Sequence, residues 1–122
     1  LAFGKYLGKL LGWGGKKAAQ EGVEKAGHMV YRAIDESGTV RYVGITSRGL
    51  TVRAAEHKAA DAAKAGLEFI QMKGMQNLTK TQARIFEQRL INQYGLQKNG
   101  GLLLNKINSI APKKWSQYGI KN

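Results

Sequence analysis

Two runs of β-branched and aromatic residues, separated by a short polar segment, constrain the fold of this chain most strongly. The runs cover residues 29–34 and 40–45, and the segment between them reads Asp35-Glu36-Ser37-Gly38-Thr39. Such runs favour strands, and a short connection that contains Gly favours an antiparallel hairpin. We therefore predict a β-hairpin over residues 29–45.

The length of the hairpin loop decides which side chains share a face. A loop of two or four residues gives cross-strand partners whose numbers add to an odd sum, which places Tyr31, Tyr42 and Gly44 on one face. A loop of three residues would separate them. The pattern of the strands leaves both cases open.

An Ala-rich stretch predicts a helix over residues 52–65, which Gly66 ends. Its small and apolar residues form a stripe that should face inward. The members of this stripe are Val52, Ala55, Ala59, Ala62 and Ala63. Arg53, His57 and Lys64 lie along one flank of it, because spacings of four and seven residues return to nearly the same angle on a helix.

A capping box, Thr79-Lys80-Thr81-Gln82, marks the start of a second helix, and Gly95 ends it. Projected at about 100° per residue, this helix has a single apolar stripe. Its members are Ala83, Phe86, Leu90, Ile91 and Tyr94. Glu87 lies in the middle of the stripe, where an ionised carboxylate is costly unless a cation accompanies it. An ion pair with Arg53 or Arg89 and a bound metal both explain this position.

The chain has 122 residues, which fits one compact domain. With a third strand at residues 69–72, the elements predict an α/β (α+β) fold in which helices flank a small three-stranded, mostly antiparallel sheet. This domain would cover residues 28–122 and end in a basic tail. Residues 1–27 are rich in Gly and Lys, and we expect a basic linker or a membrane-contacting leader there. No run of apolar residues is long enough to span a bilayer, so stable membrane insertion is not expected.

Charge and composition restrict the partners and the chemistry. Twenty Lys and Arg against eight Asp and Glu give a net charge of +12, which argues for a polyanion such as nucleic acid or an anionic membrane surface. The chain has no Cys and two His, which excludes a thiolate nucleophile, a Cys-based zinc site and a metal cage built from His. Any metal must therefore sit mainly on oxygen ligands.

The last segment, residues 88–122, contains no acidic residue and six basic ones. Near its end Lys113 and Lys114 adjoin Trp115, and this mixture of charge and aromatic faces suits phosphates and unstacked bases. A solvated basic tail with one packed Trp is the alternative. Both interpretations remain open from composition alone.

The two tyrosine-containing runs resemble the signatures of the GIY-YIG nuclease superfamily. Met29-Val30-Tyr31 is similar to the first signature, although Met29 stands where the superfamily has a Gly, and Tyr42-Val43-Gly44 is similar to the second. The resemblance extends over roughly residues 29–108. It requires the hairpin in which both tyrosines share a face.

Later residues continue the resemblance in the same order. Arg53 and His57 follow on the first predicted helix, and Glu87 and Asn105 fall where the superfamily has its metal-binding Glu and its late Asn. The resemblance implies that Arg53 holds the scissile phosphate through its fork of donors, and that His57 shares the proton transfer or binds phosphate. Asn105 would brace the site through hydrogen bonds.

The resemblance also implies which residue takes the proton from water and which residue holds the metal ion. Tyr31 would act as general base, which requires a pKa below its ordinary value, and Tyr42 would orient water or pack. Glu87 would hold a single divalent ion, Mg²⁺ or Mn²⁺. The residues expected to bind substrate are Gly44, Thr46, Arg48, Lys64, Lys106, Lys113, Lys114 and Trp115.

The implied activity is that of a metal-dependent endonuclease that hydrolyses phosphodiester bonds, with DNA of low sequence specificity favoured over RNA. Residues 103–115 are similar to the close of the C-terminal nuclease domains of bacterial polymorphic, contact-dependent inhibition toxins. That setting implies a larger secreted or cell-surface protein, action in the cytoplasm of a target cell, and an acidic immunity protein that neutralises the domain.

Three alternatives stand beside this expectation. An RNase of the same fold would act on tRNA. A non-catalytic basic module would coat nucleic acid, with salt-sensitive binding and no cleavage. A third interpretation makes residues 1–27 the effector, acting on membranes as an amphipathic segment.

Overall fold

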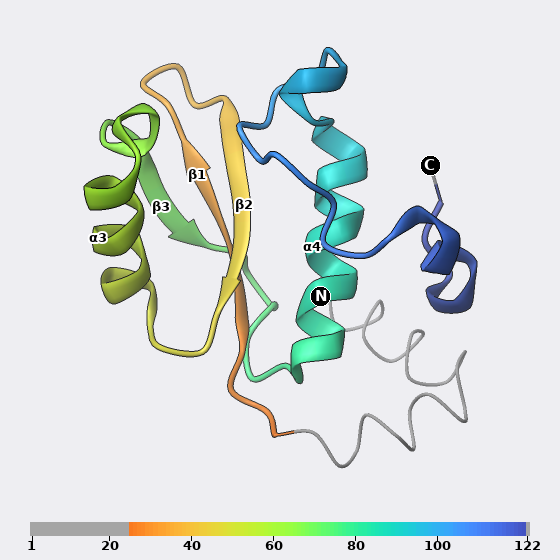
Figure 1. Ribbon diagram of the computed structural model, residues 1–122. Coiled ribbons are helices and arrows are strands. Elements are labelled where there is room, and N and C mark those ends of the chain that lie inside the picture. Colours follow the sequence, from red (N-terminus) through yellow and green to blue (C-terminus); the bar gives the residue numbers. More distant parts are fainter. Residues whose placement is uncertain (1–24, 122) are drawn as a thin grey trace.

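The computed structural model describes residues 25–121, so the expected leader lies outside the described residues apart from its last three, which are exposed. Figure 1 shows a sheet with α3 on one side and α4 on the other. The sheet has three antiparallel strands in the order β2-β1-β3, which is the α+β fold expected. Among residues 25–121, no helix has the length and apolarity needed to cross a membrane.

The predicted hairpin forms, with its first strand at the centre of the sheet and its second strand at an edge. The strands are β1 (Met29–Ile34), β2 (Val40–Thr46) and β3 (Glu68–Gln71). Tyr31 pairs with Gly44, and Ala33 pairs with Tyr42. The partner numbers add to an odd sum, so the arrangement that places both tyrosines and Gly44 on one face is confirmed.

Helix α4 (Lys80–Tyr94) begins at the predicted capping box and packs on the face of the sheet opposite the tyrosines. The Thr79 hydroxyl accepts the Gln82 N–H, and the Gln82 side chain accepts the Thr79 N–H. The expected apolar stripe packs against Val30 and Val43 in the main core. Its buried members are Ala83, Phe86, Leu90 and Ile91, and Tyr94 is partly buried beside them.

Helix α3 (Leu50–Ala60) starts and ends earlier than the predicted helix 52–65. It ends at Asp61, whose backbone is extended and whose carboxylate accepts the Ala63 N–H. This local hydrogen bond offers the backbone an alternative to the helix. The chain continues instead into a 3-10 turn, η1 (Ala62–Lys64), before Gly66 is reached.

The predicted inward stripe of α3 is wrong. Val52 is 49% exposed, and Ala55 and Ala59 are also exposed. The buried residue of this helix is His57. A polar side chain turns toward the sheet because the buried hydroxyl of Tyr31 needs a hydrogen-bond partner there.

The segment after η2 (Gln97–Asn99) closes the free edge of β2. The Leu104 N–H donates to the Arg41 carbonyl. The side-chain amide of Asn105 accepts the Val43 N–H at 3.0 Å and donates to the Val43 carbonyl at 2.8 Å. This segment is therefore a loop paired with the edge of the sheet, where Asn105 takes the place of a neighbouring strand.

Gln88 of α4 holds the chain that follows this loop. Its side chain is fully buried. The amide nitrogen donates to the side-chain oxygens of Asn92 and Asn108, and the amide oxygen accepts the Ile110 N–H. Beyond this anchor, η3 (Pro112–Tyr118) crosses α4 and covers a second apolar cluster. The cluster contains Ile85, Ile110 and Ile120, with Trp115 and Tyr118 packed against them.

Replacing Gln88 by Leu, a residue of similar size, should lower the free energy of unfolding by about 2 kcal/mol, because its three partners lose buried hydrogen bonds. Gln93→Leu, at an exposed position of the same helix, is the matched control and should change stability by less than about 0.5 kcal/mol. Urea unfolding followed by circular dichroism measures both. Equal stability of the two variants would contradict the anchoring role of Gln88.

Candidate functional site

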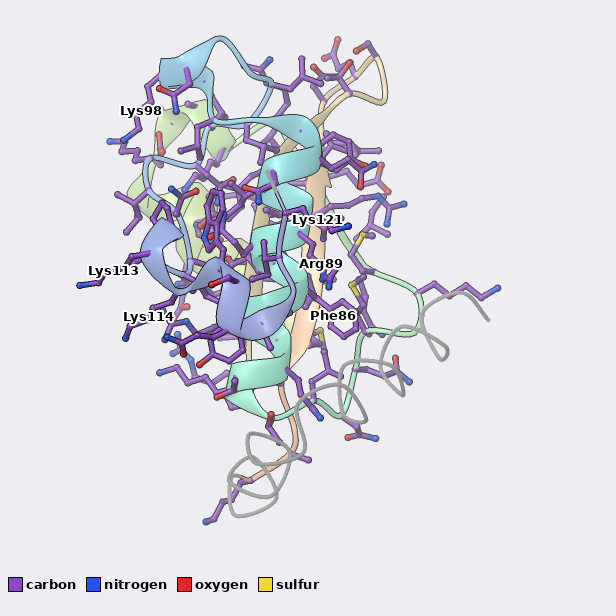
Figure 2. The ribbon with its side chains drawn as sticks, turned by 90° about the vertical axis from the view of Figure 1, so that its right-hand side faces the viewer. Phe86, Arg89, Lys98, Lys113, Lys114 and Lys121 are labelled. Atoms are coloured by element: carbon purple, nitrogen blue, oxygen red, sulfur yellow. The ribbon has the colours of Figure 1, made fainter. Side chains whose placement is uncertain are left out.

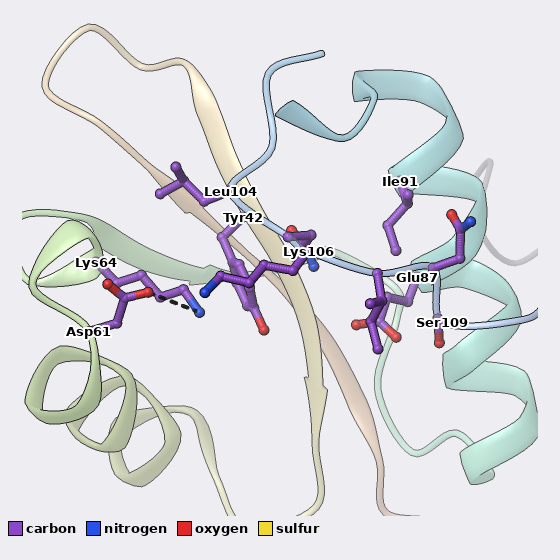
Figure 3. A pocket seen from close by; sticks show the side chains of 11 residues that line it. Tyr42, Asp61, Lys64, Glu87, Ile91, Leu104, Lys106 and Ser109 are labelled. Atoms are coloured by element: carbon purple, nitrogen blue, oxygen red, sulfur yellow. Dashed lines mark ion pairs between the residues drawn. The ribbon is translucent and has the colours of Figure 1, made fainter. Parts of the chain in front are cut away.

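A cavity of about 480 Å³ opens beside the edge of β2, between the tail of α3 and the middle of α4. Figure 3 shows that Lys64 and Lys106 reach into it from one side and Glu87 from the other. The residues that line it are Tyr42, Asp61, Lys64, Glu87, Ile91 and residues 104–109. Three of the six expected catalytic residues, Tyr42, Glu87 and Asn105, are therefore brought together here.

Glu87 stands at the border between the apolar face of α4 and this cavity. Burial raises the pKa of its carboxyl, while a hydrogen bond from Ser109 and the charge of Arg84 lower it. Within residues 25–121 the ion pairs join Arg48 and Arg53 to Glu56, and Lys64 to Asp61, so none of them includes Glu87. The ion pair with Arg53 or Arg89 considered from the sequence is absent from this described part.

Tyr31 lies behind the cavity and has no exposed surface. Its hydroxyl oxygen is 2.7 Å from Nε2 of His57, and the positive charge of Arg53 acts on it. Burial raises the pKa of Tyr31 well above its ordinary value, the charge of Tyr42 adds to the increase, and Arg53 opposes it. The expected lowering of this pKa is therefore wrong for the structure as it stands, because removing the phenolate from water outweighs the nearby guanidinium.

His57 is 7% exposed and is enclosed by aromatic rings. It stacks on Phe69 with ring centres 5.5 Å apart and meets the edge of Tyr42 at 4.8 Å. Burial, Arg53 and Lys64 lower the pKa of His57 to about 4. The imidazole is therefore neutral at pH 7, with one nitrogen that donates and one that accepts.

Gly44 was expected to contact substrate, but it is buried beneath Tyr31 on the paired strand. A Cβ atom added there would lie 2.6 Å from Cζ of Tyr31 and closer still to the hydroxyl oxygen. The absence of a side chain thus lets the phenol ring lie flat on β2 and reach His57. Gly44 therefore positions Tyr31, and its burial does not support the expected contact with substrate.

Arg53 and Arg48 are tied together by one carboxylate. Glu56 Oε1 accepts Arg48 at 2.6 Å and Arg53 at 3.2 Å. Arg53 remains about one-third exposed and Arg48 more than half. Thr46 is buried, and its hydroxyl accepts the Arg48 N–H. Thr46 therefore holds the loop that presents Arg48 and does not itself face solvent.

Asn105 and Lys106 have different functions in the loop that crosses the cavity. Asn105 braces the edge of β2 through its two bonds to Val43. Lys106 extends into the cavity from the same loop. Ile107 is 74% exposed at the rim. The bracing role expected for Asn105 agrees with these contacts.

The basic residues of the last segment other than Lys106 do not line the cavity. In Figure 2, Lys113 and Lys114 project to the same side of α4 as Lys98, whereas Lys121 and Arg89 lie on the other side. The Trp115 ring packs in the second apolar cluster, and its Nε1–H donates to the Ile110 carbonyl at 2.7 Å. Its position matches the packed Trp of the alternative interpretation and does not support stacking on a base.

Sequence reasoning missed Asp61, Asn108 and Ser109 among the lining residues. An Asp that follows an Ala run and precedes two further Ala residues is a signal for a helix end, so Asp61 could have been found. Asn108 and Ser109 reach the site because Gln88 anchors the loop across α4. That crossing is a tertiary contact with no local pattern in the sequence.

Comparison of the chain with protein-family models, with curated proteins and with solved structures finds no match. Among residues 25–121, no group of three or more His, Asp and Glu side chains lies close enough to hold a metal ion. The function is therefore argued below from the cavity and its residues.

Gly44→Ala should lower the free energy of unfolding by about 1–3 kcal/mol, because the added Cβ overlaps the buried Tyr31 ring. Gly66→Ala is the matched control, since a Cβ at Gly66 meets nothing within 4 Å, and it should be neutral or slightly stabilising. Urea unfolding measures both variants. If Gly44→Ala were as stable as Gly66→Ala, the close contact between β2 and Tyr31 would not constrain the site.

Proposed function

We propose that this chain is a metal-dependent endonuclease that hydrolyses phosphodiester bonds, with DNA of low sequence specificity as the favoured substrate. The observation that carries the proposal is the carboxylate of Glu87, which has no ion pair within residues 25–121 and faces a cavity that also holds two lysines and a tyrosine. A site for phosphodiester hydrolysis needs groups that neutralise charge on the phosphoryl oxygens and groups that position water. The cavity supplies candidates for both.

Glu87 would hold the divalent ion. Its carboxylate is a hard oxygen ligand, and Mg²⁺ characteristically uses one or two carboxylates together with waters and phosphate. Burial makes an uncompensated charge at Glu87 costly, and a cation would remove that cost. The bound ion would supply positive charge next to the phosphoryl and leaving oxygens.

Lys64 and Lys106 would bind the phosphate. Both side chains line the cavity, and ammonium groups interact with phosphate as point charges. Arg53 would add a donor from behind Tyr42, because it is partly exposed and already oriented by Glu56. The exposed Lys113 and Lys114 would attract the rest of the nucleic acid through long-range charge.

The two tyrosines would have different roles, one toward the attacking water and the other toward its proton. Tyr42 lines the cavity, so it would contact the attacking water. Tyr31 lies behind it, with ring centres 6.3 Å apart, and would take the proton as general base once water reaches it. His57 would stabilise the phenolate through its hydrogen bond to the Tyr31 oxygen, and Arg53 would stabilise it through its positive charge.

The biological setting is part of the same proposal. We infer a toxin domain within a larger secreted or cell-surface bacterial protein, acting in the cytoplasm of a target cell. The net charge of +12 would steer an acidic immunity protein to the domain as effectively as it steers nucleic acid. RNA, including tRNA, is the second candidate substrate because it carries the same phosphodiester charge.

Glu87→Gln should lower the rate of nucleic-acid cleavage about 100-fold or more, because the amide cannot replace a charged metal ligand. The variant should stay folded, since removing a buried charge is not destabilising. Purified protein is incubated with supercoiled plasmid or total tRNA, in Mg²⁺ or EDTA. Glu68→Gln, at an exposed carboxylate on β3, is the matched control and should cut at the wild-type rate.

The substrate that disappears in Mg²⁺ settles DNA against RNA. Undiminished cleavage by Glu87→Gln would contradict the assigned metal ligand. Salt-sensitive binding of both substrates without cleavage would contradict the proposed endonuclease activity. It would support the alternative, a non-catalytic basic module that binds nucleic acid.

A further inference from the structure

His57 is held between two polar groups, one at each ring nitrogen. Its Nε2 lies 2.7 Å from the Tyr31 hydroxyl oxygen. Its Nδ1 lies 3.5 Å from Nζ of Lys64. The ring itself is nearly inaccessible, at 7% exposure. The partner at each nitrogen therefore comes from the protein, and the two partners together decide which nitrogen carries the proton.

Lys64 is fixed in place by three further features of its surroundings. Its Nζ lies 3.9 Å from the centre of the Tyr42 ring, in a cation–π contact. The same atom is 3.9 Å from a carboxylate oxygen of Asp61. The side chain is only 14% exposed, and the 3-10 turn η1 that carries it is capped by Asp61. Burial lowers the pKa of Lys64, and the charges of Arg53 and Lys106 add to that lowering. The carboxylate of Asp61 and the aromatic face of Tyr42 oppose it and favour the charged ammonium form.

A charged ammonium can only donate hydrogen bonds. Nδ1 of His57 must therefore present its lone pair to Lys64, because an N–H directed at an ammonium would be repelled. A neutral imidazole has a single ring proton, which is then on Nε2. It follows that Nε2–H donates to the Tyr31 oxygen, which the positive charge of Arg53 also influences.

We propose that Lys64 sets the tautomer of His57 and thereby makes the Tyr31 oxygen the acceptor of the imidazole N–H. Lys64 is in this respect a positioning residue that acts on Tyr31 through the imidazole. The charged groups that face His57 are Arg53, Lys64, Glu56 and Asp61, and of these Lys64 is the one in contact with Nδ1. A donor at this oxygen favours the phenolate over the phenol.

The reverse arrangement would have the opposite effect. With the ring proton on Nδ1, Nε2 would accept the Tyr31 O–H, and the tyrosine would already be using its own proton as a donor. The catalytic consequence of the Lys64 contact rests on the proposed function, in which Tyr31 takes a proton from water. The tautomer itself does not depend on that function.

The tautomer is measured by nitrogen-15 NMR of the imidazoles in the full chain at pH 7. The chain has two histidines, so a His57→Gln variant assigns both sets of signals. Wild-type protein should show His57 with a lone pair at Nδ1 and a proton at Nε2. Lys64→Met should move the proton at least partly to Nδ1, while Lys64→Arg should keep it on Nε2 because Arg also only donates. His28 should not change.

Lys106→Met is the matched control, since it removes the other cavity lysine and should leave the His57 signals unchanged. A wild-type spectrum with the proton on Nδ1 would overturn the proposal, whichever variants fold. A Lys64→Met spectrum identical to wild type would overturn it as well.

Cleavage kinetics test the catalytic consequence separately. Lys64→Met should lower kcat about 100-fold, as expected when a general base is lost, whereas Lys106→Met should mainly raise KM. An unchanged kcat in a Lys64→Met protein whose tautomer has shifted would overturn the link to Tyr31. If the chain cuts neither DNA nor RNA, the proposed function fails while the spectra still decide the tautomer.

Discussion

The burial of the Tyr31 hydroxyl is the constraint on which the arrangement of the site depends. A buried hydroxyl without a partner costs about 1–3 kcal/mol, and the central strand of the sheet offers it no backbone group. His57 satisfies it from α3, at 2.7 Å. The polar face of α3 is thereby held against the sheet, and the bare backbone of Gly44 leaves room for the ring between them.

The two sides of the sheet consequently differ in character. On the α4 side, Val30 and Val43 join a continuous apolar core. On the α3 side, Tyr31, Tyr42 and His57 form an aromatic and polar layer. The cavity lies where these two sides meet, at the β2 edge that Asn105 seals. Glu87 reaches it from α4 and Lys64 from η1 (Figure 3), so groups of opposite charge come from different elements of the chain.

The sequence predicted those features of the structure that depend on interactions between neighbouring residues. The capping box at Thr79 was predicted and is confirmed. The hairpin was also predicted, but the strand pattern left its register open, and the structure shows the register in which Tyr31 lies opposite Gly44. Capping and alternation depend on a few neighbouring residues, so a single sequence indicates them, whereas the register also depends on the loop. The position of Glu87 in the middle of the apolar stripe predicted an ion pair with Arg53 or Arg89, or a bound metal; within residues 25–121 the ion pair is absent.

Other features depend on contacts between distant segments. The inward face of α3 is set by Tyr31 rather than by the Ala pattern, so a reading of helix periodicity selected the wrong side. Gln88 is a fully buried amide, and its hydrogen-bond partner Ile110 belongs to the C-terminal segment that crosses α4. The pKa of Tyr31 was expected to fall because of Arg53, but burial, which has no signature in the sequence, outweighs that charge.

The central claim is that the cavity beside Glu87 hydrolyses phosphodiester bonds with the help of a divalent ion. The most direct measurement is the single-turnover rate of cleavage of an end-labelled DNA or RNA oligonucleotide as a function of Mg²⁺ concentration. We predict no cleavage in EDTA and a rate that rises with Mg²⁺ and saturates, as binding to one site requires. A rate independent of Mg²⁺, or intact oligonucleotide at every concentration, would contradict the account.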